Sequence, residues 1–241
     1  MENKTIFTGA ATAIITPLDE NGINYEKFGR LVDWQIEEGI DAIVVCGTTG
    51  ESSTLTDEEH KQAIDFVINR VNKRVPVIAG TGSNDTDYAI ELTKYACKSG
   101  ADGVLVVTPY YNKATQNGLI KMFSTIADNS TAPVILYNVP SRTGMNITID
   151  TLQELSKLPN IVGVKDATGN ISYTAELASK LPELAIYSGN DDMTIPVMSL
   201  GGKGVISVIA NILPEDTHNM CQYYLDGDVE KARQLQLSML D

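Results

Sequence analysis

Short apolar runs alternate with amphipathic stretches along the whole chain. The runs are rich in Val and Ile and almost continuously apolar, which is typical of strands buried on both faces of a parallel sheet. Eight of them are predicted to be strands: Ala13–Ile15, Ala42–Cys46, Val75–Ala79, Val104–Val107, Val134–Tyr137, Ile161–Val164, Leu184–Tyr187 and Val205–Ile209.

The stretches between these runs carry apolar residues at helical spacing. The first predicted helix starts at Asn24 and is closed by Gly39. Thr56-Asp57-Glu58-Glu59 has the spacing of a capping box and opens the second helix. Further helices are predicted at about 84–100, 115–129, 148–158, 171–181, 191–200, 214–226 and from Asp228 onwards.

Strands alternating with helices in this way predict an α/β fold, a (β/α)₈ TIM barrel. A doubly wound sheet is the alternative, because alternation alone does not reveal closure. No GxGxxG motif opens a helix after a strand, so a dinucleotide site has little support. We expect residues 1–227 to form the barrel and residues 228–241 to begin a further helical region.

Composition narrows the class of protein. The chain is 43% hydrophobic and 20% charged, which is ordinary for a globular domain, and no apolar run reaches the ~18 residues that span a bilayer. The polar start, Met1 to Lys4, lacks the pattern of a signal peptide, so a cytoplasmic protein without a membrane partner is predicted. The net charge of −13 disfavours nucleic-acid binding.

The few cysteines and histidines argue against a metal centre. Cys46, Cys97 and Cys221 are widely separated and are predicted to be reduced, structural thiols. His60 and His218 form none of the usual ligand spacings. We therefore expect neither a metal nor another cofactor.

The active site of a barrel lies at the carboxyl ends of its strands. Polar and small residues gather in the segments after seven strands: Thr16-Pro17, Cys46 to Glu51, Gly80 to Gly82, Thr108 to Asn112, Tyr137 to Arg142, Lys165-Asp166 and Ser188 to Asp192. In the last of these segments, Asp191 and Asp192 are predicted to cap the next helix and not to form a catalytic carboxylate pair.

Lys165 is the strongest candidate for chemistry. It directly follows an apolar strand, so its stem begins inside the barrel mouth. Desolvation there lowers the pKa of the amine, and a neutral amine can attack a carbonyl. A lysine that leaves the strand for solvent or pairs with Asp166 is the alternative. Tyr137 ends the neighbouring strand, where its phenol either passes protons or simply packs.

Four other residues at the rim are candidates. Thr48 and Thr49 lie in a Gly-flanked turn whose hydroxyls and backbone N–H groups suit a small carboxylate, although Thr is also an ordinary capping residue. Tyr111 follows Tyr110, and such a pair suits a subunit contact as well as catalysis. Arg142 can bind a carboxylate bidentately or form a surface salt bridge.

Five stretches together resemble the dihydrodipicolinate synthase family, within the pyruvate-dependent aldolase superfamily. As a set they are highly specific, and they run along nearly the whole chain in the family's order. They are Gly47 to Glu51, Thr108 to Asn112, Tyr137 to Gly144, Gly163 to Asp166 and Gly202 to Ser207.

The resemblance implies a reaction between pyruvate and L-aspartate-4-semialdehyde that gives hydroxytetrahydrodipicolinate, on the route to diaminopimelate and lysine. It implies that Lys165 forms a Schiff base with pyruvate and that Tyr137 donates and accepts protons. Thr48 then links Tyr137 to Tyr111, which reaches in from a neighbouring subunit of a homo-oligomer, a dimer or tetramer.

The resemblance also implies how substrates are held. Thr49 holds the pyruvate carboxylate, and the backbone at Ile206 shapes that pocket. Gly189 belongs to the substrate-binding set. Arg142 binds the carboxylate of the second substrate. An N-acetylneuraminate lyase is the nearest alternative, although those enzymes typically carry Ser-Thr in place of Thr48-Thr49.

Two departures from the family pattern matter. Asp57 and Tyr88 replace a His and a Glu of the lysine-sensitive type, which argues against feedback inhibition by lysine. Family chains usually continue through C-terminal helices that are largely missing here. The sequence therefore predicts lower stability or altered oligomerisation relative to a longer family member, and it leaves an inactive remnant as a further alternative.

Overall fold

Eight parallel strands close into a barrel at the centre of the computed structural model, which describes residues 5–240. Residues Met1 to Lys4 and Asp241 lie outside the described residues. The last strand pairs back onto the first, which confirms the (β/α)₈ barrel and excludes the doubly wound sheet. In order around the barrel, the strands are β1 (Gly9–Ala13), β4 (Ala42–Val45), β5 (Val77–Gly80), β6 (Gly103–Val107), β7 (Val134–Asn138), β8 (Ile161–Asp166), β9 (Ala185–Ser188) and β10 (Gly204–Ser207).

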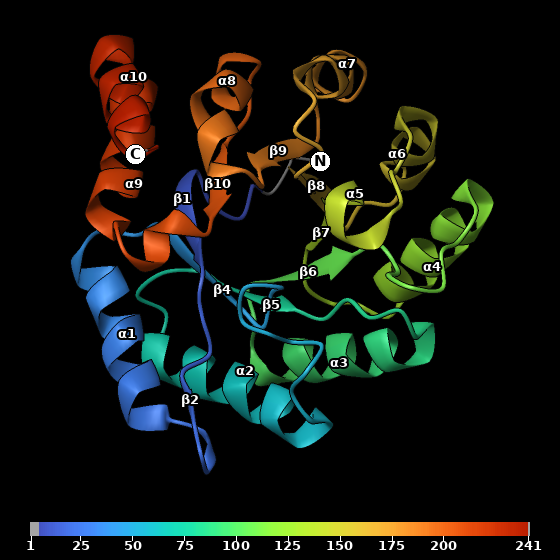
Figure 1. Ribbon diagram of the computed structural model, residues 1–241. Coiled ribbons are helices and arrows are strands. Elements are labelled where there is room, and N and C mark those ends of the chain that lie inside the picture. The colour runs from blue at the N-terminus through green and yellow to red at the C-terminus, as the bar shows by residue number, and fades with distance from the viewer. Residues whose placement is uncertain (1–4, 241) are drawn as a thin grey trace.

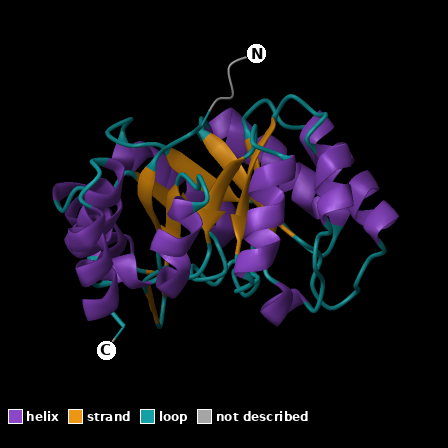
Figure 2. Cartoon of the chain, turned by 90° about the horizontal axis from the view of Figure 1, so that it is seen from above, coloured by secondary structure: helices purple, strands orange, loops and turns teal. Residues whose placement is uncertain are grey.

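Helices surround the strands on all sides, as Figure 1 shows. Figure 2 shows the same arrangement after a quarter turn, with strands inside and helices outside. The helices are α1 (Tyr25–Glu37), α2 (Asp57–Val71), α3 (Thr86–Ser99), α4 (Gln116–Asp128), α5 (Pro140–Thr143), α6 (Ile149–Leu155), α7 (Ile171–Lys180), α8 (Thr194–Ser199), α9 (Pro214–Leu225) and α10 (Val229–Ser238), with the 3₁₀ turns η1 (Asp191–Met193) and η2 (Ile209–Asn211).

The predicted helix starts are set by side-chain caps. Asn24 caps α1, and the Thr56–Glu59 capping box of α2 is present in both directions. Asp85 caps α3, where its side chain accepts from the N–H groups of Asp87 and Tyr88. These local bonds satisfy backbone N–H groups that a helix leaves unpaired at its start.

Two layers of apolar side chains alternate along the strands. Residues that face outward, such as Val164 and Ile186, pack against the helices. Residues that face inward fill the barrel with small and medium side chains. At its amino-terminal end the barrel is closed by Phe7 and Tyr187, whose rings stack at 4.4 Å, and the Tyr187 hydroxyl donates to the Phe7 carbonyl at 2.7 Å.

The prediction of the first strand is wrong in position. The pattern placed it at Ala13–Ile15, whereas β1 covers Gly9–Ala13 and Ile15 is 42% exposed. The Gly-Ala-Ala-Thr-Ala stretch has little hydropathy, yet its small side chains are what fit the crowded barrel interior. The antiparallel pair β2 (Leu18–Asp19) and β3 (Gly22–Ile23), and the short helix α5, are further elements that the pattern missed.

The helix predicted from Asp228 is present as α10. It packs against α9 and α8, and Leu235 joins the core while Leu237 stays exposed. Gln236 fastens it: the side-chain oxygen accepts from the Ile195 N–H at 2.8 Å, and the amide donates to the Asp192 carbonyl. No helix within residues 5–240 is both long enough and apolar enough to cross a bilayer.

Candidate active site

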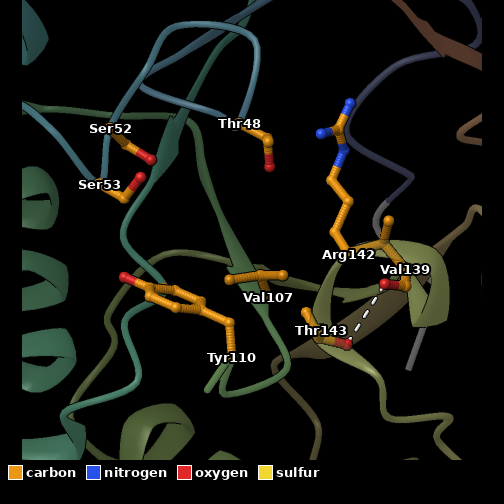
Figure 3. A pocket seen from close by; sticks show the side chains of 9 residues that line it. Thr48, Ser52, Ser53, Val107, Tyr110, Val139, Arg142 and Thr143 are labelled. Atoms are coloured by element: carbon orange, nitrogen blue, oxygen red, sulfur yellow. Dashed lines mark hydrogen bonds between the residues drawn. The ribbon is translucent and has the colours of Figure 1, made fainter.

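A hollow of about 260 Å³ opens at the carboxyl ends of the strands. Figure 3 shows that Thr48 and Arg142 reach the same side of this hollow from different elements, while Tyr110 lies across from Ser52 and Ser53. The lining residues are Thr48, Ser52, Ser53, Gly82, Val107, Tyr110, Val139, Arg142 and Thr143. Four of the seven predicted rim segments therefore line this hollow, through Thr48, Gly82, Tyr110 and Arg142, whereas Lys165 and Tyr137 are not among its lining residues.

Lys165 lies near the end of β8 with only 4% of its surface exposed. Burial lowers the pKa of its amine to about 8; the charge of Asp191 opposes this shift and that of Arg142 adds to it. Two residues earlier on β8, Gly163 allows the close approach of β9, because a Cβ there would lie 2.6 Å from the Ala185 carbonyl oxygen. At pH 7 about a tenth of the amine is consequently neutral, far more than for a lysine with the ordinary pKa.

Both alternatives for Lys165 are wrong. Its burial excludes a lysine that leaves the strand for solvent. Asp166, the proposed partner, uses its carboxylate elsewhere: it accepts from the Thr174 hydroxyl at 2.7 Å and from the Thr168 N–H at 2.9 Å. The carboxylate therefore fixes the start of the following loop and leaves the amine free to act.

Tyr137 stands beside the lysine on β7. The two residues are direct partners in the strand register, and the Lys165 Nζ lies 4.5 Å from the centroid of the tyrosine ring. Burial raises the pKa of the phenol, while the charge of Arg142 and a hydrogen bond with Thr48 lower it. The phenol is thus protonated at neutral pH and stabilised as it gives up its proton, which suits a proton donor and acceptor.

The turn that carries Thr48 and Thr49 is set by unusual backbone geometry. Cys46, at its start, has a left-handed φ of 54°. That conformation turns the Cys46 carbonyl against Gly80 of β5, where any Cβ would overlap the oxygen. The turn brings the Thr48 hydroxyl to Tyr137, and it leaves Thr49 half-buried beside it.

Arg142 extends from α5 at the mouth of the hollow. The helix is fastened by Thr143, whose hydroxyl accepts from Thr108 at 2.9 Å and donates to the Val139 carbonyl at 3.3 Å (Figure 3). The Arg142 side chain is exposed, and its charge reaches both buried groups of the site. An exposed guanidinium at the mouth of the hollow suits a carboxylate on an incoming molecule.

Ile206 lies on β10, and Gly189 directly follows β9, the strand that pairs with the Lys165 strand. Ile206 is fully buried in β10 and faces the barrel interior. Gly189 follows β9, and its N–H donates to the Asp166 carbonyl at 2.7 Å. A Cβ at Gly189 would lie 2.7 Å from that of Ala167, so the position requires glycine for close packing.

Tyr111 does not join the other predicted residues within this chain. It is 93% exposed and held at a left-handed φ of 71°. It lines a separate open hollow of about 610 Å³ with Asn84–Asp87 and Asn112. Its side chain is thus displayed on the outside of the molecule at the cost of local backbone strain.

The prediction that Asp191 and Asp192 cap the next helix is wrong. Neither η1 nor α8 has a side-chain cap. The Asp191 carboxylate instead accepts from the Ser207 hydroxyl and from the N–H groups of Val208 and Ile209 at 3.1 Å each. The sequence signal for this role is an acidic residue shortly after a barrel strand. The hydrogen-bond partners of Asp191 could not be read from it, because they lie 16 to 18 positions away in sequence.

No three His, Cys, Asp or Glu side chains within residues 5–240 converge as metal ligands. The three cysteines are free thiols, as predicted, and Cys46 and Cys221 are buried. Burial raises the pKa of the Cys46 thiol to about 12, so it stays protonated and unreactive. Among the candidate residues, Lys165 and Tyr137 are therefore the buried titratable pair.

A closed (β/α)₈ barrel with a buried, weakly basic lysine at its mouth defines a lyase of the Schiff-base type. The chain belongs to the Dihydrodipicolinate synthetase family, which it matches over residues 6–241. It is 57% identical over 239 residues to the 4-hydroxy-tetrahydrodipicolinate synthase of Acetivibrio thermocellus, with 99% of this chain and 81% of that protein covered.

Solved structures agree with this assignment. Dihydrodipicolinate synthase from Aquifex aeolicus superposes with a TM-score of 0.95 at 45% identity, covering 98% of this chain and 81% of that one. The chloride-inhibited enzyme of Acinetobacter baumannii, solved in complex with pyruvate, gives a TM-score of 0.93 at 47% identity, with 96% and 80% covered.

Proposed function

We propose that this chain is a 4-hydroxy-tetrahydrodipicolinate synthase that condenses pyruvate with L-aspartate-4-semialdehyde through Lys165. The observation that carries the proposal is the buried amine of Lys165, with a pKa lowered to about 8, beside the ring of Tyr137. The name shared by relatives at 55–58% identity and the pyruvate complex of a solved relative support the choice of substrates.

The first step joins pyruvate to the protein. The neutral amine of Lys165 attacks the C2 carbonyl, and the carbinolamine loses water to give an iminium. Tyr137 supplies the proton that leaves with that water and takes one back, with Thr48 as its hydrogen-bonding partner. Thr49 holds the pyruvate carboxylate, the backbone at Ile206 shapes that pocket, and Gly189 belongs to the substrate-binding set.

The second step forms the carbon–carbon bond. Loss of a C3 proton converts the iminium into an enamine, whose C3 attacks the aldehyde carbon of the semialdehyde; the aldehyde oxygen takes up a proton and becomes the hydroxyl. Arg142 binds the carboxylate of that substrate. The substrate's own amine then attacks C2, which closes the ring and releases Lys165 as a free amine.

Tyr111 takes part from a second copy of the chain. Its phenol is displayed on the outside of the molecule, and its strained backbone is the kind of cost that proteins retain at functional positions. Entering a neighbouring hollow, it completes a relay from Tyr137 through Thr48 to solvent. The homo-oligomer and the cytoplasmic location that the sequence predicts belong to the same proposal.

Reductive trapping tests the central claim. Incubation with pyruvate and cyanoborohydride, followed by peptide mass mapping, is expected to find a pyruvyl adduct at Lys165 and none in Lys165→Arg. Lys157→Arg, at an exposed salt-bridged lysine, is the matched control and should be trapped like the wild type. A wild-type chain without the adduct refutes the proposal and leaves the inactive remnant.

A second assay separates the reaction from its relatives. Aspartate semialdehyde added to the pyruvate-loaded protein should be consumed with formation of the cyclic product. N-acetylneuraminate should not be cleaved, since the relatives at 55–58% identity carry the synthase name and the lyase alternative is not favoured. Cleavage of the sugar at a comparable rate would contradict the assignment.

A further inference from the structure

Asp191 binds the turn that follows β10 with both oxygens of its carboxylate. One oxygen accepts from the Ser207 hydroxyl, and the other from the N–H groups of Val208 and Ile209. Ile209 begins η2, so the carboxylate caps a turn from a distant part of the chain. Hydrogen bonds to a charged acceptor are about twice as strong as neutral ones, which makes this a firm anchor.

The anchored turn is continuous with the wall of the lysine site. Ile206 in the barrel interior directly precedes Ser207, whose hydroxyl also accepts from the Ala210 N–H at 2.9 Å. On its other side, the carbonyl of Ala210 accepts from the buried Gln35 amide at 2.8 Å. The position of the Ile206 backbone therefore depends on a turn that Asp191 holds from the neighbouring strand end.

The Asp191 segment is itself fixed from behind. Gln236 of α10 donates to the Asp192 carbonyl within η1 and accepts from the Ile195 N–H in α8. Because these bonds hold the Asp191 segment in place, its carboxylate holds the Ser207–Ile209 turn at a fixed position. Asp191 thus links the segment after β9 to the turn after β10.

The same carboxylate supplies a negative charge to the lysine environment. Asp191 favours the protonated form of Lys165, while Arg142 and burial favour the neutral form. Tyr137 is the other titratable side chain against the amine, and Asp166 is engaged with the loop outside. Burial thus lowers the pKa of the amine most, and two charges of opposite sign, Asp191 and Arg142, act on it in opposite directions.

We propose that Asp191 is a positioning residue for the Lys165 site: it locks the Ser207–Ile209 turn behind Ile206 and balances the charge of Arg142 at the amine. This inference rests on the proposed function, because it concerns how the pyruvate-binding lysine is held and charged. Nothing in it requires Asp191 to touch a substrate.

Two substitutions separate the two parts of the role. Asp191→Asn keeps the shape and an acceptor for the Val208 and Ile209 N–H groups but removes the charge. Asp191→Ala removes the anchor as well. Asp192→Asn is the matched control, because this neighbour is exposed, loses the same charge and makes no side-chain bond among the described residues.

The readouts are the pyruvate concentration that half-saturates adduct trapping and the pH profile of the condensation. For Asp191→Asn, the acidic limb of the profile should move to lower pH by about half a unit, because loss of a nearby negative charge favours the neutral amine. Asp191→Ala should move the limb likewise and raise the half-saturating pyruvate concentration about 10-fold. Asp192→Asn should change neither.

Three outcomes decide the question. An Asp191→Asn profile that coincides with wild type overturns the charge role, and an Asp191→Ala half-saturation equal to wild type overturns the anchor. If Asp191→Ala fails to fold, the Asp191→Asn profile alone decides, and an unshifted limb overturns the proposal. Wild type without a pyruvyl adduct at Lys165 overturns the proposed function and this inference together.

Discussion

At the scale of single residues, Lys165 shows what a reactive amine costs the fold. Its pKa falls from 10.5 to about 8 on burial, which corresponds to roughly 3 kcal/mol against the protonated form. The folded chain binds this proton less tightly than the unfolded chain does. The cost is therefore full below pH 8 and disappears as the pH rises towards 10.5.

Lys165→Met should abolish trapping of pyruvate and make the fold more stable at pH 7, by up to about 3 kcal/mol. The gain should shrink between pH 8 and 10.5. Urea unfolding at pH 7 and at pH 9.5 measures it. Lys157→Met, at an exposed position, should give no comparable gain, and a Lys165→Met chain less stable than wild type at pH 7 would contradict the argument.

The positions of Lys165, Tyr137 and Arg142 could be predicted, because each lies at or shortly after the end of a strand whose burial the pattern of Val and Ile reveals. The contacts of Asp191 could not, since they depend on how two strand ends lie side by side in space. The exposure of Tyr111 depends on a left-handed backbone that no local pattern announces. The position of a residue along a strand can be read from the sequence. Its hydrogen-bond partners on other strand ends at the barrel mouth cannot.

At the scale of elements, the approach of β4 to β5 positions the Thr48 turn. The left-handed Cys46 carbonyl fits only against a glycine at position 80. On the outer side, His60 of α2 fastens the same region through its Nε2, 2.8 Å from the Gly80 carbonyl. The turn therefore takes its place from close backbone packing.

Gly80→Ala should destabilise the fold by about 2 kcal/mol, because the added methyl overlaps a backbone atom that cannot move away freely. It should also lower the condensation rate by displacing Thr48. Gly29→Ala in α1 is the matched control, since its methyl meets nothing closer than 3.4 Å and alanine favours a helix. Equal urea midpoints for the two variants would refute the packing argument.

Long, periodic elements were predictable, and short or weakly apolar ones were not. The capping box at Thr56 fixes the start of α2 through bonds between neighbours in sequence. β1 is rich in alanine and was misplaced towards Ile14 and Ile15, which are more apolar. The two-residue strands β2 and β3 and the four-residue α5 are too short to carry a period.

At the scale of the whole molecule, closure of the barrel is what alternation of strands and helices could not reveal. It rests on the parallel pairing of β1 with β10, residues about 195 positions apart in sequence. Assembly is likewise outside the reach of the pattern. Because Tyr111 lies on the outer surface, it can take part in catalysis only if a second copy of the chain binds there.

Mixing two inactive variants tests whether Tyr111 acts between chains. Tyr111→Phe retains Lys165, and Lys165→Met retains Tyr111, so a mixed dimer contains one complete site. Random mixing should restore about a quarter of the wild-type condensation rate. Mixed oligomers shown by mass spectrometry but no more active than either parent would contradict a role for Tyr111 across the interface.

The stacked rings of Phe7 and Tyr187 close the amino-terminal end of the barrel, so its interior is reached from the carboxyl ends of the strands. Whatever reaches Lys165 must come down from the rim and leave by the same way. A molecule bound at Arg142, at the mouth of the hollow, therefore obstructs the entry and exit of molecules that react with the Lys165 amine. Because the route to Lys165 begins at the rim, the smaller substrate must reach the amine before the larger one occupies the mouth.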